Sequence, residues 1–144
     1  MIDLLPGIRS SASALGAERL RMEVISQNIA NANTTRGLDG RPYQRQLVSF
    51  ESVLDQQPGA RPGPAAPSNV RVASVQIDQR EPRLIYDPTH ADADPASGMV
   101  AMPDINIQEE MVDLIASSRA FEANLAVVRN ARTMAMQTLS IGKH

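Results

Sequence analysis

The sequence predicts a mainly α-helical α+β fold in which long N- and C-terminal helices pair as a coiled-coil hairpin, with a short β-strand subdomain inserted between them. Nine of the ten prolines lie between Pro42 and Pro103, so residues 7–41 and 104–144 lack the residue that interrupts helices. Both segments repeat apolar residues at heptad spacing, whereas the middle contains short strand-like runs. We therefore expect an N-terminal helix with its cap (1–36), a β-rich outer subdomain (37–103) and a long C-terminal helix (104–144).

The N-terminal helix is expected to run from Ile8 to about Asn31. Ser11 and Glu18 occupy positions that would be apolar in a complete heptad pattern, so the apolar stripe is narrow and the helix needs a partner. The apolar residues of the stripe recur every seven positions, with one companion in the last heptad: Ile8, Leu15, Met22 and Ile29, and Ile25.

Three asparagines, Asn28, Asn31 and Asn33, suit the end of this helix, because Asn tolerates the left-handed conformation and its amide can bind freed backbone groups. The pair Asp39-Gly40 that follows is a tight-turn signal.

The middle of the chain predicts strands at 43–54, 70–77 and 83–86. Four prolines and two glycines predict an exposed, mobile loop at 56–69. Three of the four aromatic residues fall in this zone, which suggests a modest core of its own: Tyr43, Phe50 and Tyr86.

His90, Asp92 and Asp94 raise the possibility of a metal site, since all three are metal-ligand residue types. No second cluster of His or carboxylates supplies further ligands, so a polar turn is the favoured interpretation.

The C-terminal helix is expected to begin after Asn106, an N-cap candidate, and to continue to about Ile141, with Gly142 as its stop. Glu109 and Glu110 favour the positive end of the helix dipole. The heptad positions of this helix, which form its predicted packing seam, alternate spacings of four and three residues. They are Ile107, Met111, Leu114, Ser118, Phe121, Leu125, Val128, Arg132, Ala135 and Leu139.

Such a helix of about 35 residues spans roughly 50 Å, more than the roughly 40 Å diameter of a compact globule of this chain length. The expected shape is an elongated hairpin with the β subdomain at its far end and with apolar faces left for neighbours, most simply copies of the same chain. The predicted assembly interface comprises Ile8, Leu15, Met22, Ile25, Ile29, Met111, Leu114, Phe121, Leu125, Val128 and Leu139.

Composition excludes several functions. Fourteen basic against sixteen acidic residues, with no run of more than two like charges, argue against nucleic-acid binding. The absence of cysteine excludes a disulfide scaffold or a thiolate site. We find no signal peptide, membrane span, phosphate-binding loop or catalytic constellation, so we expect no enzyme, cofactor, metal, small-molecule substrate or direct membrane insertion.

Several motifs resemble those of bacterial flagellar rod and hook axial proteins. The segment Asn28–Asn33 resembles their N-terminal signature, and Gly37–Tyr43, Leu84–Asp94, Val100–Val112 and Ser118–Asn124 resemble the proximal-rod members. Met99 and the segment Pro88–Ala91 depart from that pattern. The residues that carry the resemblance are Asn28, Asn31, Asn33, Gly37, Gly40, Pro42, Tyr43, Tyr86, Pro88, His90, Asp92, Pro103, Glu109, Glu110 and Asn124.

The resemblance implies a structural subunit of the basal-body rod, exported by the flagellar type III apparatus without a cleaved signal peptide and assembled in the periplasmic space. Its terminal helices would build a helical drive shaft that transmits torque. Implied partners are copies of itself, other rod proteins, the rod–ring junction proteins and the export apparatus. A cytoplasmic coiled-coil adaptor or export chaperone is the alternative.

Overall fold

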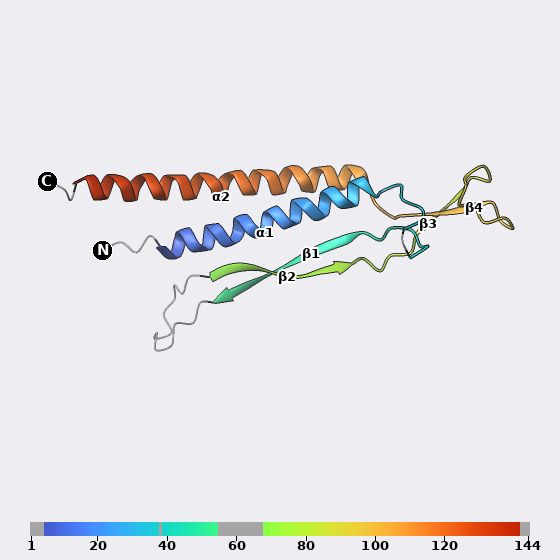
Figure 1. Cartoon of the computed structure of the whole chain (residues 1–144), viewed down its shortest axis with the longest axis horizontal. Coiled ribbons are helices and arrows are strands. Elements are labelled where there is room, and N and C mark those ends of the chain that lie inside the picture. Colours follow the sequence, from blue (N-terminus) through green and yellow to red (C-terminus); the bar gives the residue numbers. More distant parts are fainter. Residues whose placement is uncertain (1–4, 38, 55–67, 142–144) are drawn as a thin grey trace.

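The computed structural model describes residues 5–37, 39–54 and 68–141, and it has the predicted α+β composition with a helix at each end. Along the chain come α1 (Leu5–Ala30), β1 (Gln46–Leu54), β2 (Ser68–Ile77), β3 (Arg83–Tyr86), β4 (Met99–Met102) and α2 (Ile107–Ile141). The molecule is elongated, with the start of α1 and the end of α2 at one end and the β3–β4 hairpin at the other (Figure 1).

The two helices lie side by side and run in opposite directions (Figure 1). With 35 residues, α2 is about 52 Å long, and it extends beyond the start of the 26-residue α1. The predicted N-cap is confirmed, because the carboxamide oxygen of Asn106 accepts a hydrogen bond from the backbone N–H of Gln108 at 3.1 Å. The predicted stop at Gly142 lies outside the described residues.

The strands form two separate antiparallel pairs rather than one lobe. In the β1–β2 pair, Gln46 faces Ile77 and Leu54 faces Ser68, with an irregularity between Ser49 and Phe50. In the β3–β4 pair, Arg83 faces Met102 and Tyr86 faces Met99.

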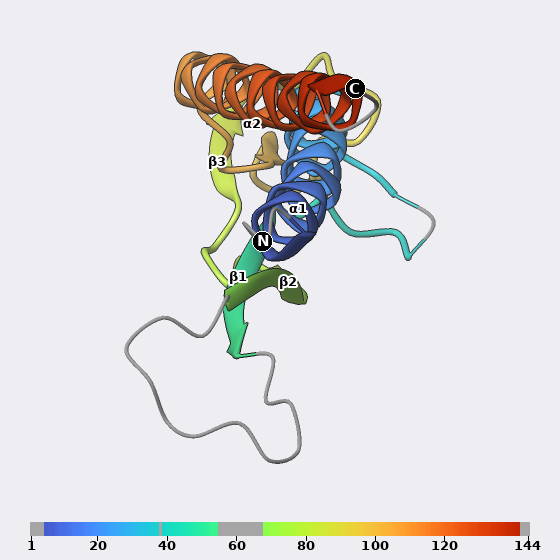
Figure 2. The same ribbon diagram turned by 90° about the vertical axis from the view of Figure 1, so that its left-hand side faces the viewer.

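The expectation of a single β subdomain at the far end is therefore wrong. Only β3–β4 projects beyond the helices, whereas β1–β2 runs back along α1 so that α1 lies between this pair and α2 (Figure 2). Two contacts hold it there: the backbone N–H of Val70 donates to the hydroxyl of Ser13 at 3.1 Å, and the guanidinium of Arg21 lies 5.7 Å from the Phe50 ring centroid. The narrow apolar stripe of α1 thus has two partners.

Two strand predictions also need correction. The β2 strand begins at Ser68, so the last two residues of the expected loop 56–69 belong to a strand, and the rest of that loop lies outside the described residues. The β4 strand was not predicted, because Met99-Val100-Ala101-Met102 is short and contains only one β-branched residue.

The asparagines after α1 do not act through left-handed backbone, because every non-glycine residue in the described part has negative φ. Asn31 still serves the helix end, since its backbone N–H and its side-chain amide both donate to the carbonyl of Gln27. The predicted turn at Asp39-Gly40 is present, with Gly40 at φ 71°.

The apolar core is small. Among the described residues, and leaving proline aside, only seven apolar side chains are buried, and three of these are alanines: Ala17, Val24, Ile25, Ala32, Val100, Ile105 and Ala131. The expectation that the aromatic residues of the middle form a core of their own is wrong at Tyr86, which is 69% exposed, and every residue of β3 is exposed.

We predict opposite effects for two glycine-to-alanine changes. Gly98 has φ 66°, and a Cβ there would lie 2.9 Å from the Tyr86 ring, so Gly98→Ala should lower the free energy of unfolding by about 1–2 kcal/mol. Gly16 lies within α1, and an added Cβ there would have nothing within 4 Å, so Gly16→Ala should raise the free energy of unfolding by about 0.5–1 kcal/mol. Urea unfolding followed by circular dichroism measures both, and equal effects would contradict the assignment.

Candidate assembly surface and the polar junction that orients it

The innermost positions of α2, which face α1, are occupied by polar and small residues. Glu110, Ser117 and Ala131 are buried and Asn124 is half-buried, and these four positions lie seven residues apart. Within the described chain, α1 is the only helix or strand that packs against α2. The inward-facing heptad position of α2 therefore begins at Glu110, not at the apolar Met111.

The residues of the predicted interface differ in how far they are buried in the single chain. On α1, Ile25 is buried and the other four are half-buried: Ile8, Leu15, Met22 and Ile29. On α2, four are half-buried: Leu114, Phe121, Leu125 and Val128. Met111 and Leu139 point to solvent, with exposed fractions of 52% and 71%.

Two polar atoms within the helix layers have no hydrogen-bond partner in the described chain. They are the hydroxyl of Ser117, on the inner face of α2, and the Oε2 atom of Glu18, on α1. A buried polar group without a partner costs about 1–3 kcal/mol. The helix pair thus has a weaker interface than its length suggests.

Nine of the sixteen exposed large apolar side chains of the described chain lie on α2. They occur on several sides of the helix, and Val127 and Met134 flank the buried Ala131 at spacings of four and three. Val127, Met134 and Ile141 lie seven residues apart and therefore follow one stripe of the helix. We call the whole set the outer apolar surface: Ile107, Met111, Val112, Ile115, Val127, Met134, Met136, Leu139 and Ile141. No described helix or strand covers it.

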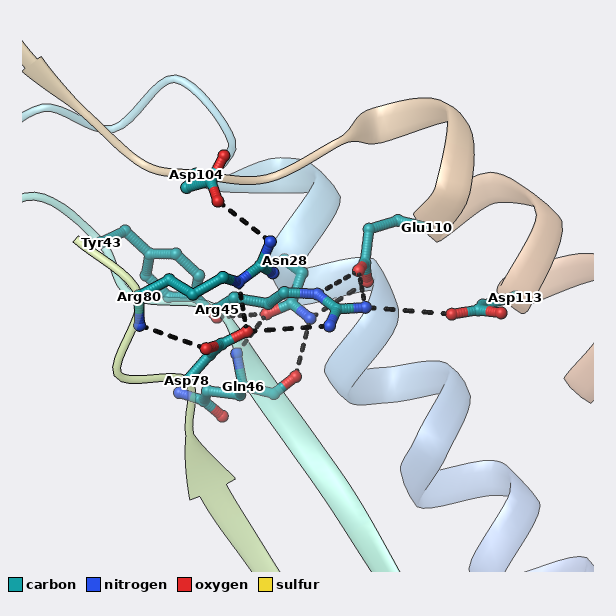
Figure 3. A network of polar contacts seen from close by, with 9 residues as sticks. All are labelled: Asn28, Tyr43, Arg45, Gln46, Asp78, Arg80, Asp104, Glu110 and Asp113. Atoms are coloured by element: carbon teal, nitrogen blue, oxygen red, sulfur yellow. Dashed lines mark hydrogen bonds and ion pairs between the residues drawn. The ribbon is translucent and has the colours of Figure 1, made fainter. Parts of the chain in front are cut away.

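A cluster of polar side chains joins α1, the segment before β1, the end of β2 and the start of α2 (Figure 3). We call it the polar junction: Asn28, Tyr43, Arg45, Gln46, Asp78, Arg80, Asp104, Glu110 and Asp113. It sets the angle at which the strands and the loop before α2 leave the helix pair.

Asn28 lies at the centre of the polar junction, with 1% of its surface exposed. Its amide nitrogen donates to the carbonyl of Gln46 at 2.9 Å and to Oε2 of Glu110 at 3.1 Å. Its oxygen accepts hydrogen bonds from the Tyr43 hydroxyl at 3.0 Å and the Gln46 backbone N–H at 2.9 Å. Asn28 thus uses both donors and both acceptor positions, and it acts as a tie between segments rather than as the helix stop that we expected.

Glu110, at 1% exposure, is a buried carboxylate whose charge is matched by Arg45. The Nε atom of Arg45 donates to Oε1 of Glu110 at 2.6 Å, and the same guanidinium lies 3.9 Å from both Asp78 and Asp113. Burial raises the pKa of Tyr43, and the nearby charge of Glu110 raises it further, so this tyrosine remains a hydrogen-bond donor. Glu110 was expected to act through the helix dipole, but its main partner is Arg45.

The outer part of the polar junction is a chain of ion pairs. Arg80 contacts Asp78 at 2.8 Å and Asp104 at 3.0 Å. Burial raises the pKa of Asp78, but the hydrogen bonds and charges of Arg80, together with the charge of Arg45, outweigh it, so the net pKa lies below its usual value.

The His90–Asp94 segment forms a polar turn that is tied to the segment after α1. Asp92 accepts a hydrogen bond from the Thr35 hydroxyl at 2.8 Å and lies 3.7 Å from Arg36. His90 Nδ1 accepts a hydrogen bond from the Asp92 backbone N–H at 3.1 Å. No group of three potential metal ligands occurs within the described ranges.

The remaining motif residues serve local structure. The Gly37 N–H donates to the Arg41 carbonyl at 2.8 Å, and the Asn124 amide donates to the Ala120 carbonyl at 3.0 Å. Pro103 is buried and Pro42 half-buried, whereas Asn33, Gly40, Tyr86, Pro88 and Glu109 are exposed.

Sequence reasoning missed Arg45, Asp78 and Arg80. Arg45 and Glu110 are 65 positions apart, so no local spacing links them. The only sequence feature that pointed to this contact was Glu110 itself, an acidic residue between apolar positions of the C-terminal helix.

Comparison with known proteins gives consistent similarities. A family model described as "Flagella basal body rod protein" matches residues 8–36, and one described as "Flagellar basal body rod FlgEFG protein C-terminal" matches residues 96–141. These matches cover α1 with its cap, and β4 with α2.

Relatives similar over nearly the whole chain share one description, "Flagellar basal-body rod protein FlgC". The protein from Borreliella burgdorferi is 39% identical over 96% of this chain and 97% of its own length. The Bacillus subtilis protein is 40% identical over 92% of this chain and 94% of its own length. The Salmonella typhimurium protein is 37% identical over 92% of this chain and 93% of its own length.

We predict that Arg45→Met lowers the free energy of unfolding by about 3 kcal/mol, because it leaves the buried Glu110 carboxylate without its cation. The matched control is Arg19→Met, which removes a pair whose side chains are 75% and 53% exposed and should cost less than about 0.5 kcal/mol. Equal losses in urea unfolding would argue against a structural role for the polar junction.

We also predict that Asp78 contributes to the acid sensitivity of the fold. Its pKa is lower in the folded chain than in the unfolded chain, so its stabilising effect is present above the unfolded pKa of about 3.9 and is lost as the pH falls through the folded pKa. Unfolding experiments between neutral pH and about pH 2 should therefore show a shallower loss of stability in Asp78→Asn. Parallel curves for the two proteins would contradict this assignment.

Proposed function

Because the chain belongs to the FlgC family of flagellar basal-body rod proteins, we propose that it assembles by packing the outer apolar surface of α2 against helices of neighbouring subunits. Membership makes the chain a structural subunit of the basal-body rod and not an enzyme. The proposal therefore concerns how the subunit is joined to others.

One observation carries the proposal. Nine large apolar side chains are exposed on α2, each at least 37% exposed, while, leaving proline aside, the described chain buries only seven apolar side chains. Covering half of a large apolar side chain stabilises by about 1 kcal/mol, so covering the nine would contribute on the order of 10 kcal/mol before the costs of association. A surface of this size is typical of a protein that functions in an assembly.

Heptad spacing on both terminal helices supports a coiled-coil arrangement of neighbouring subunits. We propose that the helices of successive copies, and of other rod proteins, form the wall of a helical tube, with β1–β2 on its outer side. Head-to-tail contacts whose rotation does not close into a ring continue as helical arrays. Such a tube would transmit torque through packing alone, without any chemical step.

We extend the proposal to location and export, on the basis of family membership. The subunit would be made in the cytoplasm, exported by the flagellar type III apparatus without a cleaved signal peptide, and assembled as part of the proximal rod in the periplasmic space. The rod–ring junction proteins would be further partners. No helix in the described part of the chain has the length and apolarity needed to cross a membrane.

We predict that Met111→Asp prevents incorporation into basal bodies while leaving the monomer folded. Met111 is 52% exposed and contributes little to the monomer, but a carboxylate at a buried subunit contact costs several kcal/mol, which corresponds to a loss of at least about 100-fold in incorporation. Swimming assays and immunoblots of purified basal bodies measure the effect. Leu125→Asp should block assembly too, but Leu125 is half-buried in the monomer, which makes it the less specific test.

The matched control is Asn130→Asp, which adds the same charge at an exposed polar position of α2. Circular dichroism should show equal helicity for the wild type and both single variants. Normal swimming by Met111→Asp would refute the proposed surface. Recovery of the wild-type chain only in the cytosolic fraction would instead support the adaptor or chaperone alternative.

A further inference from the structure

The described methionines divide into two groups by exposure. The three on α2 are exposed, with exposed fractions of 52% for Met111, 50% for Met134 and 60% for Met136. The described methionines outside α2 are half-buried: Met22, Met99 and Met102. Every exposed methionine of the described chain therefore belongs to the outer apolar surface, which the proposed function places at contacts between subunits.

Methionine is the only sulfur-containing residue type in this chain, because the sequence has no cysteine. No thiol therefore competes for an oxidant or forms a disulfide in its place. The thioether of methionine is oxidised to a sulfoxide, and its susceptibility follows its exposure to solvent. The three methionines of α2 thus combine chemical reactivity with access.

We propose that Met111, Met134 and Met136 are oxidation sites at which a hydroperoxide converts the subunit to a form that cannot assemble. The inference rests on the proposed function, because it concerns the regulation of the same surface. In the reaction, a sulfur lone pair attacks one oxygen of the hydroperoxide, so that an S–O bond forms and the O–O bond breaks. The sulfur loses two electrons to the oxidant. With hydrogen peroxide, the hydroxyl proton carried to sulfur passes to the second oxygen, which leaves as water.

The sulfoxide changes the surface of the subunit and not the fold of the monomer. Methionine sulfoxide is polar, and it disrupts apolar contacts. All three side chains are at least 50% exposed in the single chain, so the new oxygen stays hydrated while the subunit is free. At a contact between subunits the same oxygen would be buried without a hydrogen-bond donor, which is unfavourable. The oxidised chain should therefore keep its helices and lose its neighbours.

Site selectivity is the first test, and it does not depend on assembly. The purified full chain is treated with dilute hydrogen peroxide, and peptide mass spectrometry follows the gain of one oxygen at each methionine. The three methionines of α2 should react at least about threefold faster than the half-buried Met22, Met99 and Met102. Circular dichroism should show unchanged helicity when only the α2 sites have reacted. Equal rates in the two groups, or a loss of helicity, would overturn the assignment.

Glutamine substitution is the second test, since glutamine is unbranched and polar like the sulfoxide. The triple variant with glutamine at all three α2 methionines should enter basal bodies at least about tenfold less than the wild type. The matched control introduces glutamine at three exposed polar positions of α2 and should be incorporated normally: Asn130→Gln, Thr133→Gln and Thr138→Gln. Circular dichroism of both purified variants checks that they are folded. Normal incorporation of the first variant would show that polarity at these sites does not block assembly.

A dose of peroxide during synthesis of the subunit tests the regulation itself. The cells lack methionine sulfoxide reductases, which would reverse the reaction. Peroxide should lower incorporation of the wild-type chain at least about threefold relative to untreated cells. A variant with leucine at all three α2 methionines keeps similar apolar volume without sulfur, so its own treated-to-untreated ratio should fall less. Equal falls for the two chains would mean that damage elsewhere in the cell, and not oxidation of α2, lowers incorporation.

The outcomes separate this inference from the proposed function. Normal incorporation of Met111→Asp would refute the lateral packing and would leave the site selectivity of the free chain unchanged. Loss of incorporation by Met111→Asp, combined with equal sensitivity of the wild-type and leucine chains to peroxide, would overturn the oxidation switch and leave the lateral packing in place.

Discussion

The fold depends on the buried pair formed by Glu110 and Arg45. A carboxylate at 1% exposure is unfavourable unless its charge is matched, and Arg45 matches it while Asn28 supplies a second donor. These residues come from three separate segments, so satisfying one carboxylate fixes α1, the start of β1 and the first turns of α2 relative to one another. The helix pair is therefore oriented by polar contacts at one end, while α1 also buries Val24 and Ile25.

This arrangement explains why some apolar residues of α2, such as Met111, stay exposed. Glu110 sets the inward register, and the positions that follow at seven-residue intervals are Ser117, Asn124 and Ala131. Small and polar residues at these positions are flanked by Leu114, Phe121 and Val128, which are half-buried. Met111 and Val127 are exposed in the single chain.

Much of the local structure could be predicted, because it depends on neighbours in sequence. The strand Arg83–Tyr86 and the α2 helix after its Asn106 cap lie where residue spacing placed them, and α1 begins within three residues of Ile8. The polar junction could not be predicted, because Arg45 and Glu110 become neighbours only through the fold. The inner positions of α2 were missed for a related reason: they carry Glu110, Ser117, Asn124 and Ala131, which an apolar pattern does not identify. The apolar pattern identified the positions beside them, of which Leu114 and Phe121 are half-buried.

Under the proposed function, separate sets of residues serve the monomer and the assembly. Stability of the single chain depends on Asn28, Arg45 and Glu110, which neighbours cannot reach because they are largely buried. Association would depend on side chains such as Met111 and Val127, whose loss removes little from the monomer. A subunit built in this way can fold before it meets its neighbours and still keep a long apolar surface for them. The small core follows from the same division, because apolar residues placed on the outside cannot also fill the inside.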